Sequence, residues 1–211
     1  MMKNKLKEKI DFKFENEMVD YMIDPLSKIF NTKNYLTEFQ TGNGIPDVVF
    51  AQNIDDNNEK FNYNEFSLIY KLLRKKKILE EELKNNRIKL YLTSNGYITE
   101  NNNKFIVQKR KLNASVENII AIEAKLSDWK NGFYQALRYR YFANQSYLAI
   151  KNGYIKNIDK NLLKEYGIGL ISVNENGTKI VLKAKKQKPL DPISNLYSAQ
   201  QIILKLNENS L

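Results

Sequence analysis

Two charged residues interrupt an apolar stretch near the middle of the chain, Ile119-Ile120-Ala121-Ile122-Glu123-Ala124-Lys125-Leu126. The two-residue period of a β-strand puts residues 120, 122, 124 and 126 on one apolar face and Glu123 and Lys125 on the other. A strand this rich in β-branched residues is typical of a strand covered on both sides, where an unpaired charge is costly. We interpret Glu123 and Lys125 either as a salt-bridged pair at a sheet edge or as part of a metal-dependent phosphodiesterase site.

Two further carboxylates stand in unusual surroundings. Asp47 follows Pro46 in the apolar run 45–51, which we expect to be a strand, although an Asp after a Pro can also simply close a turn. Glu15 lies on the inward face of an amphipathic helix predicted over residues 14–30. Its alternative role is to complement the dipole in the first helical turn.

The chain of 211 residues contains neither Cys nor His. This excludes thiolate and imidazole metal ligands, cysteine nucleophiles, Ser-His-Asp triads and histidine bases. Catalysis would therefore depend on carboxylates, lysine and hydroxyl groups together with a hard cation. Mg²⁺ fits such a set because it takes oxygen ligands from one or two carboxylates, substrate phosphate and water. Mn²⁺ can substitute for it.

Hydrophobic spacing predicts an alternating α/β chain. The proline at position 25 predicts a kink or break near Asp24 in the first helix. The expected strands cover residues 35–40, 45–51, 119–126, 146–150, 167–173 and 179–182, and the expected helices cover 14–30, 65–75, 79–94, 130–143, 160–165 and 193–206.

Basic charge is concentrated in residues 57–113. The formal net charge of the whole chain is +10, and this segment holds 13 Lys/Arg against 6 Asp/Glu, a net charge of +7. Two helices separated by the basic turn Lys75–Lys77 and followed by a hairpin, with Gly96 as a left-handed cap, indicate a winged helix-turn-helix. The charge suggests a polyanionic partner, most simply nucleic acid, although a general lysine bias would give the same excess.

Pro46-Asp47 on one strand and Glu123-Ala124-Lys125 on the next resemble the PD-(D/E)XK nuclease superfamily. The gap of 76 residues between Asp47 and Glu123 shortens to 19 when the 57-residue segment 57–113 is treated as an insertion. Gln135-Ala136-Leu137-Arg138-Tyr139 matches the Gln-x-x-x-Tyr motif of RecB-like members, and Glu15 falls where Holliday-junction-resolvase-like members carry a carboxylate on the first helix. The run from Ile122 to Trp129 also resembles a bacterial group of such proteins with a winged-helix insertion.

The resemblance implies an α/β fold with a restriction-endonuclease-like αβββαβ core, in which a mixed central sheet is flanked by helices, plus an inserted winged helix-turn-helix-like subdomain. The core would comprise residues 1–56 and 114–187, the insertion 57–113, and a helical tail 188–211. In this arrangement Asp47 and Glu123, with the carbonyl of Ala124, bind Mg²⁺. Lys125 handles water or phosphate, Gln135 orients Lys125 or the substrate, and Glu15 assists.

The expected function is a Mg²⁺-dependent DNA endonuclease, and the rival is a catalytically inactive DNA-binding regulator on the same fold. The expected DNA contacts are Lys75, Lys76, Lys77, Lys84, Arg87, Lys104, Lys109, Arg110 and Tyr139. No apolar run reaches the roughly 18 residues of a membrane span, and no signal peptide is evident, so we expect a cytoplasmic protein without membrane contact.

Double-strand cleavage by a single-site enzyme requires either two successive nicks or a homodimer. The apolar residues Leu196, Ile203 and Leu206 are a candidate dimer interface, and packing on their own domain is the simpler explanation.

Overall fold

A computed structural model describes residues 12–55, 60–102, 104–174 and 176–209. The chain divides into two compact units. The first comprises Met1–Gln52 and Asn118–Leu190, and the second comprises Asn53–Glu117 and Asp191–Leu211. Among the described residues, no helix combines the length and the apolar character needed to cross a bilayer.

The first unit is built on a mixed six-stranded sheet with the order β1-β2-β6-β7-β8-β9. The parallel pairs are β6 with β7 and β7 with β8, while β1 with β2 and β8 with β9 are antiparallel. The strands are β1 (Tyr35–Thr37), β2 (Val48–Ile54), β6 (Val116–Lys125), β7 (Gln145–Lys151), β8 (Gly169–Asn174) and β9 (Gly177–Leu182).

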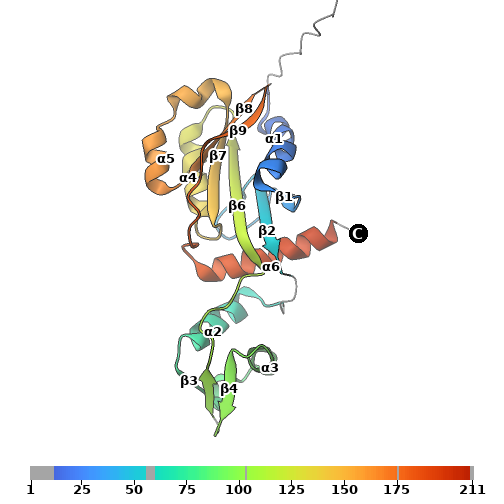
Figure 1. The fold of residues 1–211 in the computed structure, drawn as a ribbon, viewed down its shortest axis with the longest axis vertical. Coiled ribbons are helices and arrows are strands. Elements are labelled where there is room, and N and C mark those ends of the chain that lie inside the picture. Colours follow the sequence, from blue (N-terminus) through green and yellow to red (C-terminus); the bar gives the residue numbers. More distant parts are fainter. Residues whose placement is uncertain (1–11, 56–59, 103, 175, 210–211) are drawn as a thin grey trace, which may run out of the picture. The chain divides into compact units, whose positions relative to one another are not determined.

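Helices flank both faces of this sheet (Figure 1). Met18, Met22 and Leu26 of α1 (Glu15–Phe30) pack with Ile120 and Ile122 of β6 on one face. The opposite face packs against α4 (Trp129–Tyr139) and α5 (Lys160–Tyr166), through Phe133, Ala136 and Leu163 among others. A short 3-10 segment, η2 (Asn152–Asn157), follows β7. The expected α/β class with a mixed central sheet between helices is confirmed.

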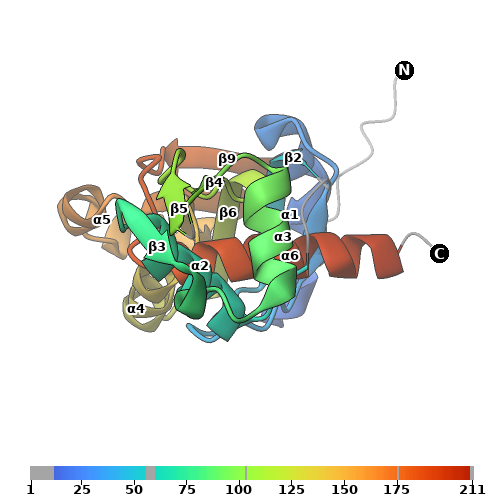
Figure 2. The same ribbon diagram turned by 90° about the horizontal axis from the view of Figure 1, so that it is seen from below.

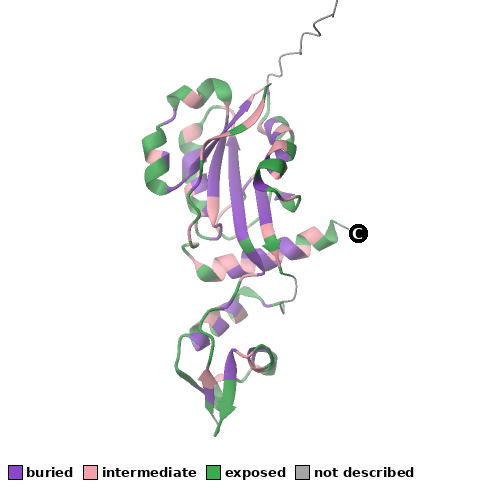
Figure 3. Cartoon of the chain, viewed as in Figure 1, coloured by how far each residue is buried: buried purple, intermediate pink, exposed green. Residues whose placement is uncertain are grey.

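The central strands are covered on both faces. β6 and β7 are buried along nearly their whole length (Figure 3), as their apolar composition predicted. Glu123 is only 1% exposed in this environment, so its charge has to be satisfied by neighbours.

The second unit contains α2 (Tyr63–Leu73), η1 (Glu80–Glu82), α3 (Asn86–Ser94) and a three-stranded sheet in the order β3-β5-β4. Its strands are β3 (Lys77–Leu79), β4 (Ile98–Asn101) and β5 (Lys104–Val107), with α3 beside the sheet in both views (Figures 1 and 2). The predicted hairpin is confirmed, and Gly96 has the left-handed φ of +65° expected after α3.

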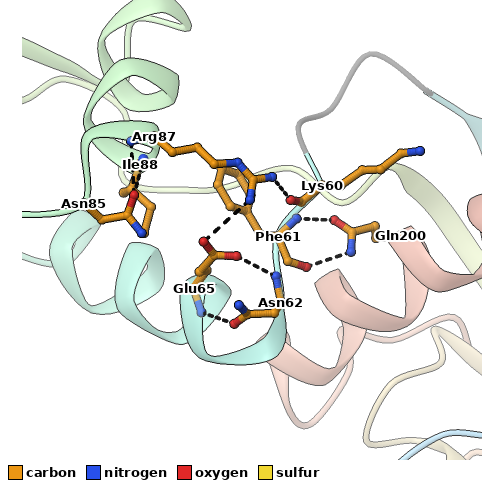
Figure 4. Close-up of polar contacts among 8 residues, drawn as sticks. All are labelled: Lys60, Phe61, Asn62, Glu65, Asn85, Arg87, Ile88 and Gln200. Atoms are coloured by element: carbon orange, nitrogen blue, oxygen red, sulfur yellow. Dashed lines mark hydrogen bonds and ion pairs between the residues drawn. The ribbon is translucent and has the colours of Figure 1, made fainter.

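The C-terminal helix α6 (Pro192–Glu208) belongs to the second unit and is not a separate tail. Leu196 is buried in the apolar core of that unit. The side-chain amide of Gln200 accepts a hydrogen bond from the N–H of Phe61 at 2.6 Å and donates one to its carbonyl at 2.7 Å (Figure 4). The prediction of an independent tail over 188–211 is therefore wrong, because α6 satisfies buried backbone groups of the insertion.

Three local predictions also require correction. The predicted helix 79–94 begins only at Asn86, because residues 77–79 pair with β5 as a strand. α1 continues through Pro25 without the predicted break, since Met22 and Leu26 on either side are fully buried against the sheet. The helical spacing of the apolar residues also predicts Ile29 on the inward face of this helix, but Ile29 is 45% exposed.

Candidate active site at the carboxyl end of β6

The residues predicted for catalysis converge on the carboxyl end of β6. Asp47 lies one residue before β2, and its Oδ2 accepts a hydrogen bond from the N–H of Ala124 at 2.6 Å. This contact brings the Pro-Asp segment and the Glu-Ala-Lys segment together across 77 positions of sequence. The structure thus joins Asp47, Glu123, Ala124 and Lys125 in one cluster.

Lys125 lies between two carboxylates. Its Nζ is 2.7 Å from Oε1 of Glu123 and 3.3 Å from Oε2 of Glu15. Glu15 is the first residue of α1, and its other oxygen accepts from the N–H of Leu126 at 3.4 Å. The predicted outer carboxylate therefore contacts the site directly through Lys125, in addition to its place in the first turn of the helix.

The electrostatics favour a charged lysine. Burial alone would lower the pKa of Lys125, but its hydrogen bond to Glu123 and the charges of Glu123, Glu15 and Asp47 oppose burial, and the pKa is raised. Lys125 is therefore an ammonium at neutral pH. Such a group can hold a phosphate or a water molecule, but it cannot accept a proton.

At Asp47, by contrast, the electrostatics disfavour the charged form. Burial and the nearby charge of Glu123 raise its pKa to about 6, and the hydrogen bond from Ala124 and the charge of Lys125 only partly compensate. A carboxyl group whose ionisation is disfavoured by burial and by a neighbouring carboxylate is suited to share a divalent cation with that neighbour. Among the described residues, no group of three or more acidic side chains is placed to hold a metal ion, so protein ligation would rest on these two and a backbone carbonyl.

Tyr139 has a different place from the one predicted. Its side chain is fully buried, and its hydroxyl hydrogen-bonds Oε2 of Glu123 and the carbonyl of Ile45, the latter at 3.0 Å. Burial and the Glu123 charge raise the pKa of Tyr139, which keeps it a donor. The predicted DNA contact by Tyr139 is corrected to a positioning role, because a buried hydroxyl already bound to Glu123 is not available to a phosphate.

Gln135 lies one turn before Tyr139 on α4. Its Oε1 is buried and has no hydrogen-bond partner among the described residues. A buried carbonyl oxygen without a donor is unusual, and an incoming donor would relieve it. The predicted orienting role of Gln135 stays a prediction.

Two glycines that the sequence analysis did not select shape this site. A Cβ on Gly132 of α4 would lie 2.8 Å from Cγ of Lys125 and 2.6 Å from Cδ1 of Leu148. Gly44 has φ of +123°, and a Cβ there would lie 3.1 Å from the Tyr139 ring. A glycine inside a helical pattern, as at position 132, was the available signal, because it costs about 1 kcal/mol relative to Ala unless packing requires it.

The cations predicted to bind DNA in the second unit fall into two groups. Lys75 pairs with Glu82, and Lys109 donates to the carbonyl of Asn95 at 3.0 Å. Arg87 lies over the Phe61 ring, 3.7 Å from Glu65, and also donates to the carbonyl of Lys60 (Figure 4). The remaining predicted cations are exposed at Lys76, Lys77, Lys84, Lys104 and Arg110.

The residues predicted for a dimer surface are buried to different degrees. Leu196 and Ile203 are each 5% exposed, and Leu196 lies in the apolar core of the second unit, whereas Leu206 is half-buried. Packing on their own domain accounts for Leu196, and the dimer stays a prediction.

Comparison with known proteins adds little to this geometry. No family model matches the chain, and no curated protein matches it. Among solved structures, the chain is similar to a protein of unknown function from Silicibacter pomeroyi, with 20% identity and a TM-score of 0.32 over 56% of this chain and 77% of that protein.

Proposed function

We propose that this protein is a Mg²⁺-dependent DNA endonuclease. The observation that carries the proposal is the cluster at the carboxyl end of β6, in which Asp47 is bonded to Ala124 while Lys125 is held between Glu123 and Glu15. These are the residues on which the resemblance to PD-(D/E)XK nucleases rests, and they come from three separate elements of the fold.

The residues present fit a hard divalent ion. Asp47, Glu123 and the carbonyl of Ala124 would hold it, and the raised pKa of Asp47, caused by burial and by the charge of Glu123, supports this assignment. When bound, Mg²⁺ supplies Lewis-acid polarisation of the scissile phosphate and neutralises charge on the leaving oxygen.

The chain's own residues would then act as follows. Lys125 remains an ammonium and binds a phosphate oxygen or fixes the attacking water by donating hydrogen bonds. Glu15 holds the ammonium from one side and Glu123 from the other. Tyr139 holds Glu123 in place through its hydroxyl, so that the carboxylate presents a fixed oxygen.

The second unit supplies DNA binding in this proposal. Its order of helix, strand, 3-10 turn, helix and hairpin supports the proposed winged helix-turn-helix, with η1 in the place of the middle helix. Register supports a basic surface at one end of the small sheet. Lys77 pairs with Ile106, and the carbonyl of Lys76 accepts from Val107, so these lysines lie beside the strand that leads to Arg110.

The direct test is incubation of plasmid, linear duplex, single-stranded and branched DNA with the protein and Mg²⁺ or Mn²⁺. We expect cleavage of at least one substrate that EDTA abolishes and that Asp47→Asn and Lys125→Ala each remove. Asp24→Asn, an exposed change on α1, is the matched control and should cleave normally.

Cleavage that survives both Asp47→Asn and Lys125→Ala would overturn the site assignment. DNA binding without cleavage of any substrate under either metal would favour the rival, a catalytically inactive DNA-binding protein on the same fold.

A further inference from the structure

A row of lysines follows β9 in the first unit, and the proposed active site does not use it. Lys183, Lys185, Lys186 and Lys188 are all exposed. We refer to residues 183–188, the segment that follows β9 in Figure 1, as the lysine strip. No acidic residue occurs between positions 176 and 190. The strip is therefore a local concentration of positive charge outside the basic insertion.

The backbone of the lysine strip is held by hydrogen bonds. The N–H of Lys185 donates to Gly167 at 3.1 Å, and the N–H of Gln187 donates to Asn144 at 2.9 Å. The carbonyl of Ala184 accepts from the Gln145 side chain at 3.3 Å. Because the chain is already ordered, presenting these lysines to a ligand costs little further backbone entropy.

The side chains of Ala184 and Gln187 also anchor the strip to the first unit. Ala184 is buried, and Gln187 accepts from Arg140 at 2.9 Å. Lys183, Lys185, Lys186 and Lys188 are exposed between and beside these two residues.

Exposed aromatic rings lie next to the points where the strip is anchored. Tyr166, 38% exposed, immediately precedes Gly167, which binds Lys185. Tyr141, 47% exposed, immediately follows Arg140, which binds both Gln187 and the N–H of Leu190. A row of ammonium groups with exposed rings beside its anchoring residues is the composition of a surface that binds single strands, where cations follow the phosphates and bases stack on rings.

We propose that the lysine strip, with Tyr141 and Tyr166, binds single-stranded DNA. Leu182, just before the strip, lies in the same cross-strand row as Glu123, through Leu170 and Leu148. From that row the strip continues toward Gly167 and Asn144, away from the carboxyl end of β6. The proposal rests on the proposed function only in taking DNA as the polyanion.

A competing explanation is that the lysines protect the edge strand β9 from pairing with another chain. That explanation accounts for the exposed charges, but not for the two exposed rings. It predicts that removing the lysines promotes aggregation and leaves DNA affinity unchanged.

The test measures binding of a short fluorescent oligo(dT) by anisotropy in EDTA, using the full chain with Asp47→Asn so that no cleavage occurs. The strip variant replaces Lys183, Lys185, Lys186 and Lys188 with Gln. The charge-matched control replaces four other exposed lysines of the same unit, Lys28, Lys33, Lys156 and Lys164, with Gln.

We expect the strip variant to flatten the log–log salt dependence of affinity by about 2 to 3 units, since each phosphate contact on a single strand contributes about 0.7. The control should keep the slope. Tyr141→Ala or Tyr166→Ala should weaken oligo(dT) binding roughly tenfold, and the matching Phe variants should not.

Equal loss of slope in the strip variant and in its control would reduce the effect to net charge and overturn the proposal. An aggregating strip variant with an unchanged slope would establish edge protection instead. If the quadruple variant does not fold, the Ala and Phe variants of the two tyrosines decide, and equal binding by both would overturn the proposal. Failure to cleave any DNA bears on the nuclease proposal alone, because this assay requires no activity.

Discussion

The tripeptide pattern Glu-x-Lys occurs in both units, at Glu123-Ala124-Lys125 in β6 and at Glu82-Leu83-Lys84 after the short turn η1. The middle residue is buried in both copies, but the flanking charges differ. In β6 the Glu123 and Lys125 side chains are 2% and 13% exposed and bind each other. In the second unit Glu82 instead binds Lys75, and Lys84 is exposed.

The difference between the copies comes from the backbone. A strand projects residues two apart to the same side, whereas η1 ends at Glu82 and separates it from Lys84. Because Glu123 and Lys125 are largely buried, their charges must be stabilised by neighbouring residues. The charges of Glu82 and Lys84 lie closer to the surface and can be stabilised by water. The chemistry of a short motif is thus decided by the element that carries it.

The largest expected effect separates the two copies by activity. Glu123→Gln and Lys125→Ala should each lower DNA cleavage by about a thousandfold, because each removes a charge aimed at the reacting phosphate or its cation. Glu82→Gln should leave the cleavage rate unchanged. Single-turnover rates at saturating protein would measure this, and comparable losses at both copies would remove the distinction.

A second prediction concerns the free-energy cost of ionising Asp47, which lies beside Glu123 and Lys125 of β6. The pKa of Asp47 is raised to about 6 in the folded state, so folding is favoured most below the unfolded pKa, near 4, and loses stability as pH rises through 6. In EDTA, Asp47→Asn should therefore stabilise the protein at pH 8 by about 2 kcal/mol and have little effect at pH 4. Urea unfolding at both pH values would test this. Greater stabilisation at pH 4 than at pH 8 would contradict the assigned sign.

A third prediction concerns the hydroxyl that holds Glu123. Tyr139→Phe leaves an oxygen of Glu123 and the carbonyl of Ile45 without this donor, which should cost about 1 to 2 kcal/mol of folding free energy. Tyr134→Phe on the same helix is the control, since that ring is 64% exposed. Chemical denaturation of the two variants gives the comparison, and equal midpoints would show that the hydroxyl is dispensable.

The smallest effect is expected at the exposed copy. Lys75 and Glu82 are paired at the surface, where solvent and salt screen the attraction. Glu82→Gln should leave the thermal midpoint unchanged at physiological salt. A clear fall in the midpoint would show that this pair stabilises the second unit. The charged residues of both copies would then contribute to stability.

The sequence patterns predicted the site residues that carry charge in an apolar strand. They missed the features that depend on contacts between residues far apart in the sequence. Glu123 could be selected because a carboxylate in a doubly covered strand needs a partner. The strand β3 could not, because Leu79, Leu83 and Leu90 fit a helical spacing and only the pairing of residues 77–79 with β5 overrides it. For Tyr139, the motif located the residue but not its task, since Glu123 lies 16 positions away in sequence.

The unit in which α6 packs could not be predicted from the sequence either. Its hydrophobic spacing predicts a helix but cannot say which core receives it. The burial of Leu196 in the second core and the two hydrogen bonds between Gln200 and Phe61, 139 positions apart, assign the helix to the second unit.

The two hydrogen bonds between Gln200 and Phe61 also affect the order in which the two units fold during synthesis. The residues of the insertion leave the ribosome well before α6, so the backbone of Phe61 cannot pair with Gln200 until the 139 positions between them have been translated. The first unit has all its strands by Leu182 and can begin to condense earlier. Completion of the second unit is therefore expected to be the late step, governed by a contact of high sequence separation.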